Sequence, residues 1–201
     1  MAPPNATDKS TSLAYGTGRE ALLAAVVTVV ARKGLKGLTF RAVGAEAGVN
    51  HTLINHYFGS MQELLAATTE WVVERSIAET GLMMVAESSE EFADAFLDSV
   101  AREPELQLFQ VEVILASRHQ PELGPAVTRL FESYVTAVEQ VLLRHCEPAD
   151  LEQPRIIFAA LNGLMLQLLT VGNSEAIRSS LVRVGELLVG SGPPAANDGR
   201  G

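Results

Sequence analysis

The chain has 201 residues, 47% of them apolar and 19% charged, which is enough for one large domain or two small ones with a buried core. The single cysteine, Cys146, excludes an intrachain disulfide and a cysteine-rich structural zinc site. The longest strongly apolar run, 21–31, is shorter than the roughly 20 residues that span a bilayer. Abundant alanine and leucine without alternating patterns predict an all-α protein.

The net charge of −9 is unevenly distributed along the chain. Residues 1–65 carry six Lys and Arg against four Asp and Glu, whereas residues 66–201 carry nine against twenty. A weakly basic beginning on an acidic remainder is unusual for a general polyanion binder. The pattern instead fits a small DNA-contacting domain on an acidic body.

The N-terminal region carries a pattern that is similar to a secretory signal. Lys9 and Arg19 precede the apolar run 21–31. However, Glu20 adjoins the run, and the apolar stretch continues a helix that ends at Gly34. We therefore expect no export, no membrane segment and a cytoplasmic location.

Both ends of the chain are expected to be disordered, because residues 1–16 are rich in Pro, Ser and Thr and residues 190–201 in Gly and Pro. Between them, Thr17, Ser60 and Ser88 each precede a glutamate by three residues, a capping box that marks a helix start. Prolines are expected in the first turns of three later helices. The nine predicted helices are 18–33, 39–47, 50–57, 60–86, 89–102, 104–118, 122–146, 153–171 and 174–189, and the prolines are Pro104, Pro121 and Pro154.

Residues 38–64, which read LTFRAVGAEAGVNHTLINHYFGSMQEL, predict two short helices joined by a tight turn. Gly48 supplies the left-handed backbone conformation that such a turn requires. The residues spaced to form a small core with the first helix are Val43, Ala47, Val49, Ile54 and Phe58. This pattern indicates a helix-turn-helix, whose second helix enters the major groove of DNA.

The stretch from Arg19 to Leu64 resembles the N-terminal domain of the TetR family of bacterial transcription regulators. The resemblance lies in an amphipathic helix ending in KGLKGLTF, then RAVGAEAGVNHTLINHYF, then GSMQEL. It implies a DNA-binding domain at residues 17–64 and a helical ligand-binding and dimerisation domain at residues 65–189.

Four positions depart from the family pattern. Asn50 stands for the usual Ser or Thr but caps a helix equally well. Gly44 stands for a small alanine, which we expect to weaken its helix by about 1 kcal/mol. Asn55 and Met61 stand where a tyrosine and a lysine commonly contact phosphate, so a weaker salt dependence is expected. Either operator affinity is modest, or Arg41 and the histidines carry more of the DNA contact.

Each candidate DNA-contacting residue has a plausible role, with plain surface or a helix cap as the alternative. Hydroxyl groups and free N–H groups at helix starts suit a phosphate, and residues that open the second helix suit base edges. Asn55 has the chemistry to read adenine. The candidates are Thr39, Arg41, Asn50, His51, Thr52, Asn55, His56, Tyr57 and Ser60.

The remainder of the chain carries no nucleotide-binding, nucleophile-elbow or metalloprotease motif. The triplet His145-Cys146-Glu147 is better explained as a helix end, where a cation complements the helix dipole, than as a metal site. We therefore expect no enzyme, no cofactor and no metal.

The predicted helix 153–171 has almost no polar face, which suggests that a partner covers one side of it. The family resemblance implies a four-helix interface between two subunits, which we assign to 122–146 and 153–171. A two-fold dimer also suits two DNA half-sites about 34 Å apart. The candidate interface residues are Val127, Leu130, Tyr134, Val138, Leu161, Leu164 and Leu168.

The resemblance also implies a small-molecule pocket among the middle helices. Aromatic and polar residues on apolar stretches are the candidates, although such residues more often only pack in a core. The primary candidates are Trp71, Phe92, Phe96, Phe109, Glu112, Phe131, Phe158, Asn162 and Met165, with Met83, Gln107, Gln110, Arg118 and Gln167 as further ones.

These features predict a ligand-responsive repressor that binds a palindromic operator in double-stranded DNA as a homodimer and is released by a small-molecule effector. An activator of the same architecture is an open alternative. Two further alternatives are a helical small-molecule carrier or enzyme with a merely structural hairpin, and a protein adaptor with a degenerate DNA-binding domain. Both would lack specific DNA binding.

Overall fold

The computed structural model describes residues 15–83, 86–145 and 152–189, which form nine α-helices and two short 3-10 helices, with no strand among them. The predicted all-α class is therefore confirmed. The α-helices are α1 (Tyr15–Lys33), α2 (Phe40–Ala47), α3 (His51–Phe58), α4 (Met61–Met83), α5 (Ser89–Arg102), α6 (Pro104–Ala116), α7 (Gly124–His145), α8 (Gln153–Val171) and α9 (Glu175–Val189). The 3-10 helices are η1 (Leu35–Gly37) and η2 (Pro121–Leu123).

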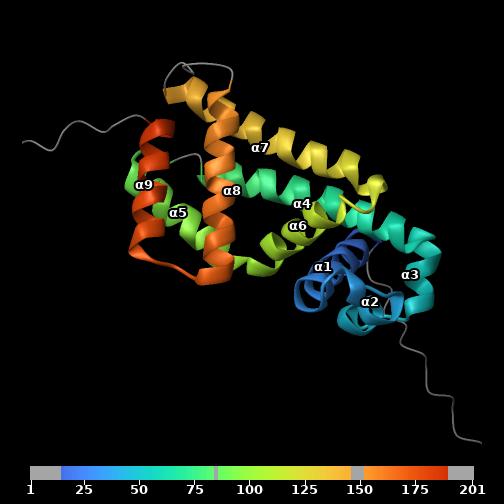
Figure 1. The fold of residues 1–201 in the computed structure, drawn as a ribbon. Helices are drawn as coiled ribbons and strands as arrows, with labels where there is room; N and C mark the ends of the chain where they lie inside the picture. The colour runs from blue at the N-terminus through green and yellow to red at the C-terminus, as the bar shows by residue number, and fades with distance from the viewer. Residues whose placement is uncertain (1–14, 84–85, 146–151, 190–201) are drawn as a thin grey trace, which may run out of the picture.

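The helices form two groups joined by long helices (Figure 1). The first three lie together at one end of the molecule, and α5, α8 and α9 lie at the other. Helices α4 and α7 run side by side between the two groups, and α6 packs against α1. The tail predicted at 190–201 and residues 1–14 of the tail predicted at 1–16 lie outside the described residues, as do Cys146 and Glu147. Tyr15 and Gly16, which were assigned to the N-terminal tail, belong instead to α1.

Local signals set most helix boundaries. The Glu91 N–H donates to Ser88 Oγ at 3.2 Å and the Glu63 N–H to Ser60 Oγ at 3.1 Å, so two of the predicted caps are confirmed. The third is wrong, because α1 begins at Tyr15 and Thr17 lies inside its first turn. Pro121 opens η2 rather than the following α-helix, which begins at Gly124.

Two apolar clusters correspond to the two groups of helices. The first joins the helix-turn-helix to α4, α6 and α7, and it contains the predicted core residues Val43 and Ile54 at 0% exposure. Ala47, Val49 and Phe58 pack against this cluster, as the sequence predicts. The second cluster joins α5, α7, α8 and α9. Because α4 and α6 contribute to the first cluster, the DNA-binding part shares its core with the body.

Candidate nucleic-acid interface and ligand cavity

The turn between α2 and α3 is built from short-range hydrogen bonds. Thr39 Oγ1 accepts from the Ala42 N–H at 3.1 Å and begins α2. Gly48 ends that helix with φ 68° and ψ 27°, a left-handed conformation that favours glycine. Asn50 Oδ1 then accepts from the Thr52 N–H at 2.9 Å and begins α3. The predicted helix-turn-helix is thus formed as the sequence indicates.

Gly44 has a role that the sequence did not reveal. A Cβ atom built there would lie 2.8 Å from the Val49 backbone oxygen and 3.2 Å from the His51 backbone nitrogen. The Gly44 backbone oxygen accepts from the Val49 N–H at 2.9 Å. Glycine at this position therefore lets α3 approach α2 closely, which corrects the expectation that it only weakens its helix.

The predicted DNA-contacting residues lie on one surface around α3 and at the starts of its neighbours. Arg41, His51, Thr52, Asn55 and His56 are all exposed. Tyr57 is 53% exposed, and its ring meets that of His56 edge-on at 6.0 Å between centroids. The surface therefore presents polar side chains that have no role in the apolar core.

Three of the candidates already serve as helix caps. The side-chain oxygens of Thr39, Asn50 and Ser60 accept from backbone N–H groups of their own helices. Ser60 is half-buried, and its hydroxyl also donates to Glu63 Oε2 at 3.0 Å. These caps order the helix starts, where the remaining N–H groups are available to an anion.

The structure shows the surroundings of two further residues of this region, Arg19 and Met61, which the sequence did not reveal. The guanidinium of Arg19, on α1, lies 5.7 Å from the centroid of the Phe58 ring and so adds a positive charge at the end of α3. Met61 is half-buried and packs against the first core cluster. No sequence signal separated Arg19 from an ordinary surface arginine.

Helix α6 is tied to the helix-turn-helix by polar contacts as well as apolar packing. Thr28 Oγ1 donates to Glu105 Oε2 at 2.8 Å, and Arg32 Nε donates to Glu105 Oε1 at 3.0 Å. Arg32 also lies 3.7 Å from Glu46 of α2. Because Glu105 lies in the first turn of α6, these contacts connect the start of α6 to α1.

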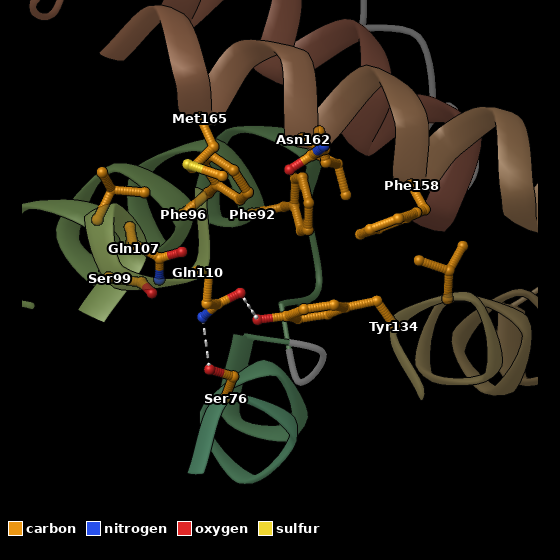
Figure 2. A pocket seen from close by; sticks show the side chains of 13 residues that line it. Ser76, Phe92, Phe96, Ser99, Gln107, Gln110, Tyr134, Phe158, Asn162 and Met165 are labelled. Atoms are coloured by element: carbon orange, nitrogen blue, oxygen red, sulfur yellow. Dashed lines mark hydrogen bonds between the residues drawn. The ribbon is translucent and has the colours of Figure 1, made fainter. Parts of the chain in front are cut away.

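A cavity lies in the body, between α4, α5, α6, α7 and α8 (Figure 2). Its volume is about 80 Å³, and it is partly open to solvent. Its lining is mostly apolar and aromatic with a few polar groups, which is typical of sites for small organic ligands. The lining residues are Ser76, Phe92, Phe96, Ser99, Val100, Gln107, Gln110, Tyr134, Val138, Phe158, Leu161, Asn162 and Met165.

A chain of hydrogen bonds crosses the cavity wall and connects three helices. Gln110 Nε2 donates to Ser76 Oγ at 2.9 Å, and the Tyr134 hydroxyl donates to Gln110 Oε1 at 3.2 Å (Figure 2). Ser76 and Gln110 are 3% and 4% exposed. Since Ser76 belongs to α4, Gln110 to α6 and Tyr134 to α7, a ligand that competes for these groups acts on all three helices.

Five of the nine primary pocket candidates line this cavity, namely Phe92, Phe96, Phe158, Asn162 and Met165. Gln107 and Gln110 line it as well. Ser76, Ser99 and Val100 were not predicted, because short or branched side chains inside a helix carry no sequence signal for a cavity.

The other four candidates lie elsewhere. Trp71 lines a separate surface hollow beside α1 and α6, and Phe109 is fully buried in the first core cluster. Glu112 lies against the turn after α1, where its Oε2 would be 3.6 Å from a Cβ at Gly34. Phe131 packs against the first cluster, with its ring edge-on to Phe158.

Most of the predicted interface residues are already buried within the single chain. Val127, Leu130, Val138, Leu161 and Leu164 are all less than a tenth exposed within a single chain. Leu168 packs against the second core cluster, and Tyr134 lines the cavity. Apolar spacing alone does not show which side of a helix is covered by its own chain, so the assignment of these residues to an interface stays a prediction.

Another face of α8 remains uncovered in the chain. Ile156 and Leu166 are 63% and 46% exposed, and the small residues Ala159, Ala160 and Gly163 are exposed between them. On α9, Leu187 is 54% exposed. Helix spacing places the α8 residues on one stripe.

This apolar stripe makes α8 unusual among the described helices. Over an 18-residue window its mean hydropathy is 1.5, and 28% of that window is buried. By length and composition it is long enough and apolar enough to cross a membrane, although a helix in a protein core or interface meets the same criteria. It is longer than the apolar run 21–31.

Two protein-family models match the chain. One, described as bacterial regulatory proteins of the tetR family, matches residues 22–68. The other, described as a tetracyclin repressor-like C-terminal domain, matches residues 87–187. The first range holds most of α1, the whole of α2 and α3 and the start of α4, and the second holds α5 to α8 and most of α9.

Individual proteins agree with these models. The HTH-type transcriptional regulator BetI of Vibrio vulnificus (strain YJ016) is 44% identical over 50 residues, and CymR of Pseudomonas putida, another such regulator, is 28% identical over 131. The matches cover 25% and 61% of this chain and only 25% and 62% of the two relatives. A crystal structure of the multidrug binding protein EbrR with imidazole has a TM-score of 0.61 and 24% identity, over 90% of this chain and 98% of that one.

Proposed function

Because the chain belongs to the TetR family of bacterial regulatory proteins, we propose that it is a dimeric transcriptional repressor released from DNA by a small molecule. Residues 17–64 bind the operator, and residues 65–189 bind the effector and a second copy of the chain. Such a regulator works in the cytoplasm, where the DNA is.

The observation that carries this proposal is the position of α4. Its first residue, Met61, packs against the core of the helix-turn-helix, and its Ser76 lines the cavity. A ligand in the cavity therefore contacts the helix that adjoins the DNA-binding surface. An effector drives release only if it binds the DNA-free conformation more tightly than the DNA-bound one.

A second route runs through α6. Gln107 and Gln110 of this helix line the cavity, and Glu105 in its first turn bonds to Thr28 and Arg32 of α1. A shift of α6 upon ligand binding would change the position of α1. The two routes act on the same three-helix unit and so favour a change in spacing between the two DNA-binding domains of a dimer.

The dimer is proposed on the uncovered faces of α8 and α9. The exposed stripe of Ile156, Leu166 and the small residues between them allows a second copy of α8 to approach closely. Leu187 extends the surface onto α9. A two-fold axis there gives two recognition helices, as an inverted-repeat operator requires.

The test is selection of bound duplexes from a random DNA pool by the purified protein at two salt concentrations. Enrichment of one inverted repeat would support a dimeric sequence-specific regulator. Weak binding to all sequences that disappears as salt rises would contradict it, because such binding comes from phosphate contacts alone. Transcription from a promoter with the selected site then separates repression from activation.

Replacing Arg41 by alanine should lower operator affinity about 10-fold or more without changing the melting temperature, because a side-chain contact to DNA contributes about 1–3 kcal/mol. Arg41 is exposed, and its loss removes nothing from the core. The same outcome is expected for His51→Ala. Fluorescence anisotropy with the selected duplex measures the affinity, and thermal unfolding measures the stability.

Arg102→Ala is the matched control, because Arg102 is an exposed arginine at the end of α5, in the body. It should leave operator affinity unchanged. A lower melting temperature for Arg41→Ala, or equal losses of affinity in both arginine variants, would contradict the assignment of Arg41 to the DNA surface.

A further inference from the structure

We propose that the cavity binds an uncharged molecule with an aromatic body and a neutral hydrogen-bonding end, such as a carboxamide, and that Gln110 binds this end. The assignment rests on the proposed function, since it names the effector class of the same cavity. It adds to that function the expectation that the cavity binds organic anions and cations less tightly than uncharged molecules of the same shape.

Aromatic walls favour an aromatic body. The rings of Tyr134 and Phe158 are stacked, with centroids 5.3 Å apart and an interplanar angle of 13°. Phe92 and Phe96 of α5 approach each other at 6.3 Å. Figure 2 shows these four side chains around the same space, from α5, α7 and α8. A flat ring between them gains offset or edge-on contacts on several sides.

The polar groups of the cavity are neutral. Among the described residues that line it, the polar side chains are two serines, two glutamines, one asparagine and one tyrosine, and no Asp, Glu, Lys, Arg or His is present. A charged ligand would lose its hydration without gaining a counter-charge from these residues. An uncharged ligand avoids this cost and still finds donors and acceptors.

Gln110 is the best-placed of these groups. Its amide uses one N–H for Ser76 and accepts one hydrogen bond from Tyr134. A primary amide has a second N–H and a second lone pair on its oxygen, so Gln110 retains the capacity for one further donor and one acceptor. A ligand carboxamide supplies both an acceptor and a donor, whereas a carboxylate lacks the donor and an amidinium lacks the acceptor.

The test uses sets of probes that differ in charge but hardly in shape. Benzamide, benzoate and benzamidine form one set, and 2-naphthamide, 2-naphthoate and 2-naphthamidine form a larger one. Isothermal titration of the full chain should show the amide binding about 30-fold or more tightly than both ions in at least one set, because the cavity lining offers no counter-charge. Tighter binding of either ion, or no binding of any probe, would overturn the ligand class.

A carboxylate placed in the cavity should reverse the preference. In Gln110→Glu we expect the amidine to bind more tightly than the amide, because the new carboxylate supplies its counter-charge. Gln107→Glu, at a half-buried position of the same lining, carries this test if the first variant does not fold. Gln140→Glu is the control, since Gln140 is exposed on α7 outside the cavity and should leave the preference unchanged.

If the folded cavity variants keep the preference for the amide probe, the proposal that these glutamine side chains bind the polar end of the ligand is overturned. Operator binding by the ligand-free chain is measured separately. Specific DNA binding with release by an anion or cation would contradict the ligand class alone. Selective amide binding by a chain that binds no DNA sequence would contradict the proposed function alone.

Discussion

Replacing both Ile156 and Leu166 by glutamate should convert the proposed dimer into a monomer and lower operator affinity by about 100-fold or more, because burial of each such side chain contributes about 1.5–3 kcal/mol. The two residues are 63% and 46% exposed in the single chain. A two-fold interface would bury each of them twice. The variant loses that contribution and brings four carboxylates together in an apolar contact.

Analytical ultracentrifugation gives the mass, which should fall from twice the 21.5 kDa of the chain to the mass of one chain. Circular dichroism should show unchanged helix content, because neither side chain belongs to the core. Leu115→Glu is the matched control, since Leu115 is 66% exposed on α6, away from α8 and α9. A variant that stays dimeric, or a control that dissociates equally, would place the interface elsewhere.

Replacing Gly44 should destabilise the helix-turn-helix, although helix propensity alone predicts the opposite. Propensity favours alanine over glycine by about 1 kcal/mol inside a helix. However, the new Cβ would lie 2.8 Å from the Val49 backbone oxygen, which cannot rotate away as a side chain does. Overpacking of this kind costs about 1–3 kcal/mol, so we expect Gly44→Ala to lower the free energy of unfolding by up to about 2 kcal/mol and Gly44→Val by more.

Operator affinity should fall with stability in these variants, because relief of the clash moves α3 relative to α2. Urea unfolding and anisotropy with the selected duplex measure the two effects. Gly124→Ala is the control, since Gly124 has a helical conformation with φ −51° and no atom within 4 Å of a built Cβ. A rise in stability for Gly44→Ala would show that α3 shifts without cost.

Much of the DNA-binding part was predictable because its signals are local. A cap such as Asn50, a turn glycine such as Gly48 and the buried spacing of Val43 and Ile54 act within a few residues of one another. Each lowers the free energy of one local conformation, whatever the rest of the chain does. The family resemblance rests on the same short stretch.

The cavity and the interface depend on contacts between distant residues. Ser76, Gln110 and Tyr134 belong to three helices, and the hydrogen bonds among them span 34 and 24 residues of sequence. No local pattern distinguishes Phe92, which lines the cavity, from Phe109, which fills the core. Only the packing of the helices decides which aromatic side chain borders an unfilled space.

The helical class, most helix ends and the helix-turn-helix could be predicted from the amino-acid sequence, because they follow from backbone preferences and apolar spacing within each segment. The packing of the helices determines which face of α8 the chain covers. It also shows that a side chain at position 44 would clash with the Val49 backbone oxygen. In an almost wholly apolar helix, the spacing of apolar residues does not show which face is buried. A close approach between two backbones likewise exists only after both helices have packed.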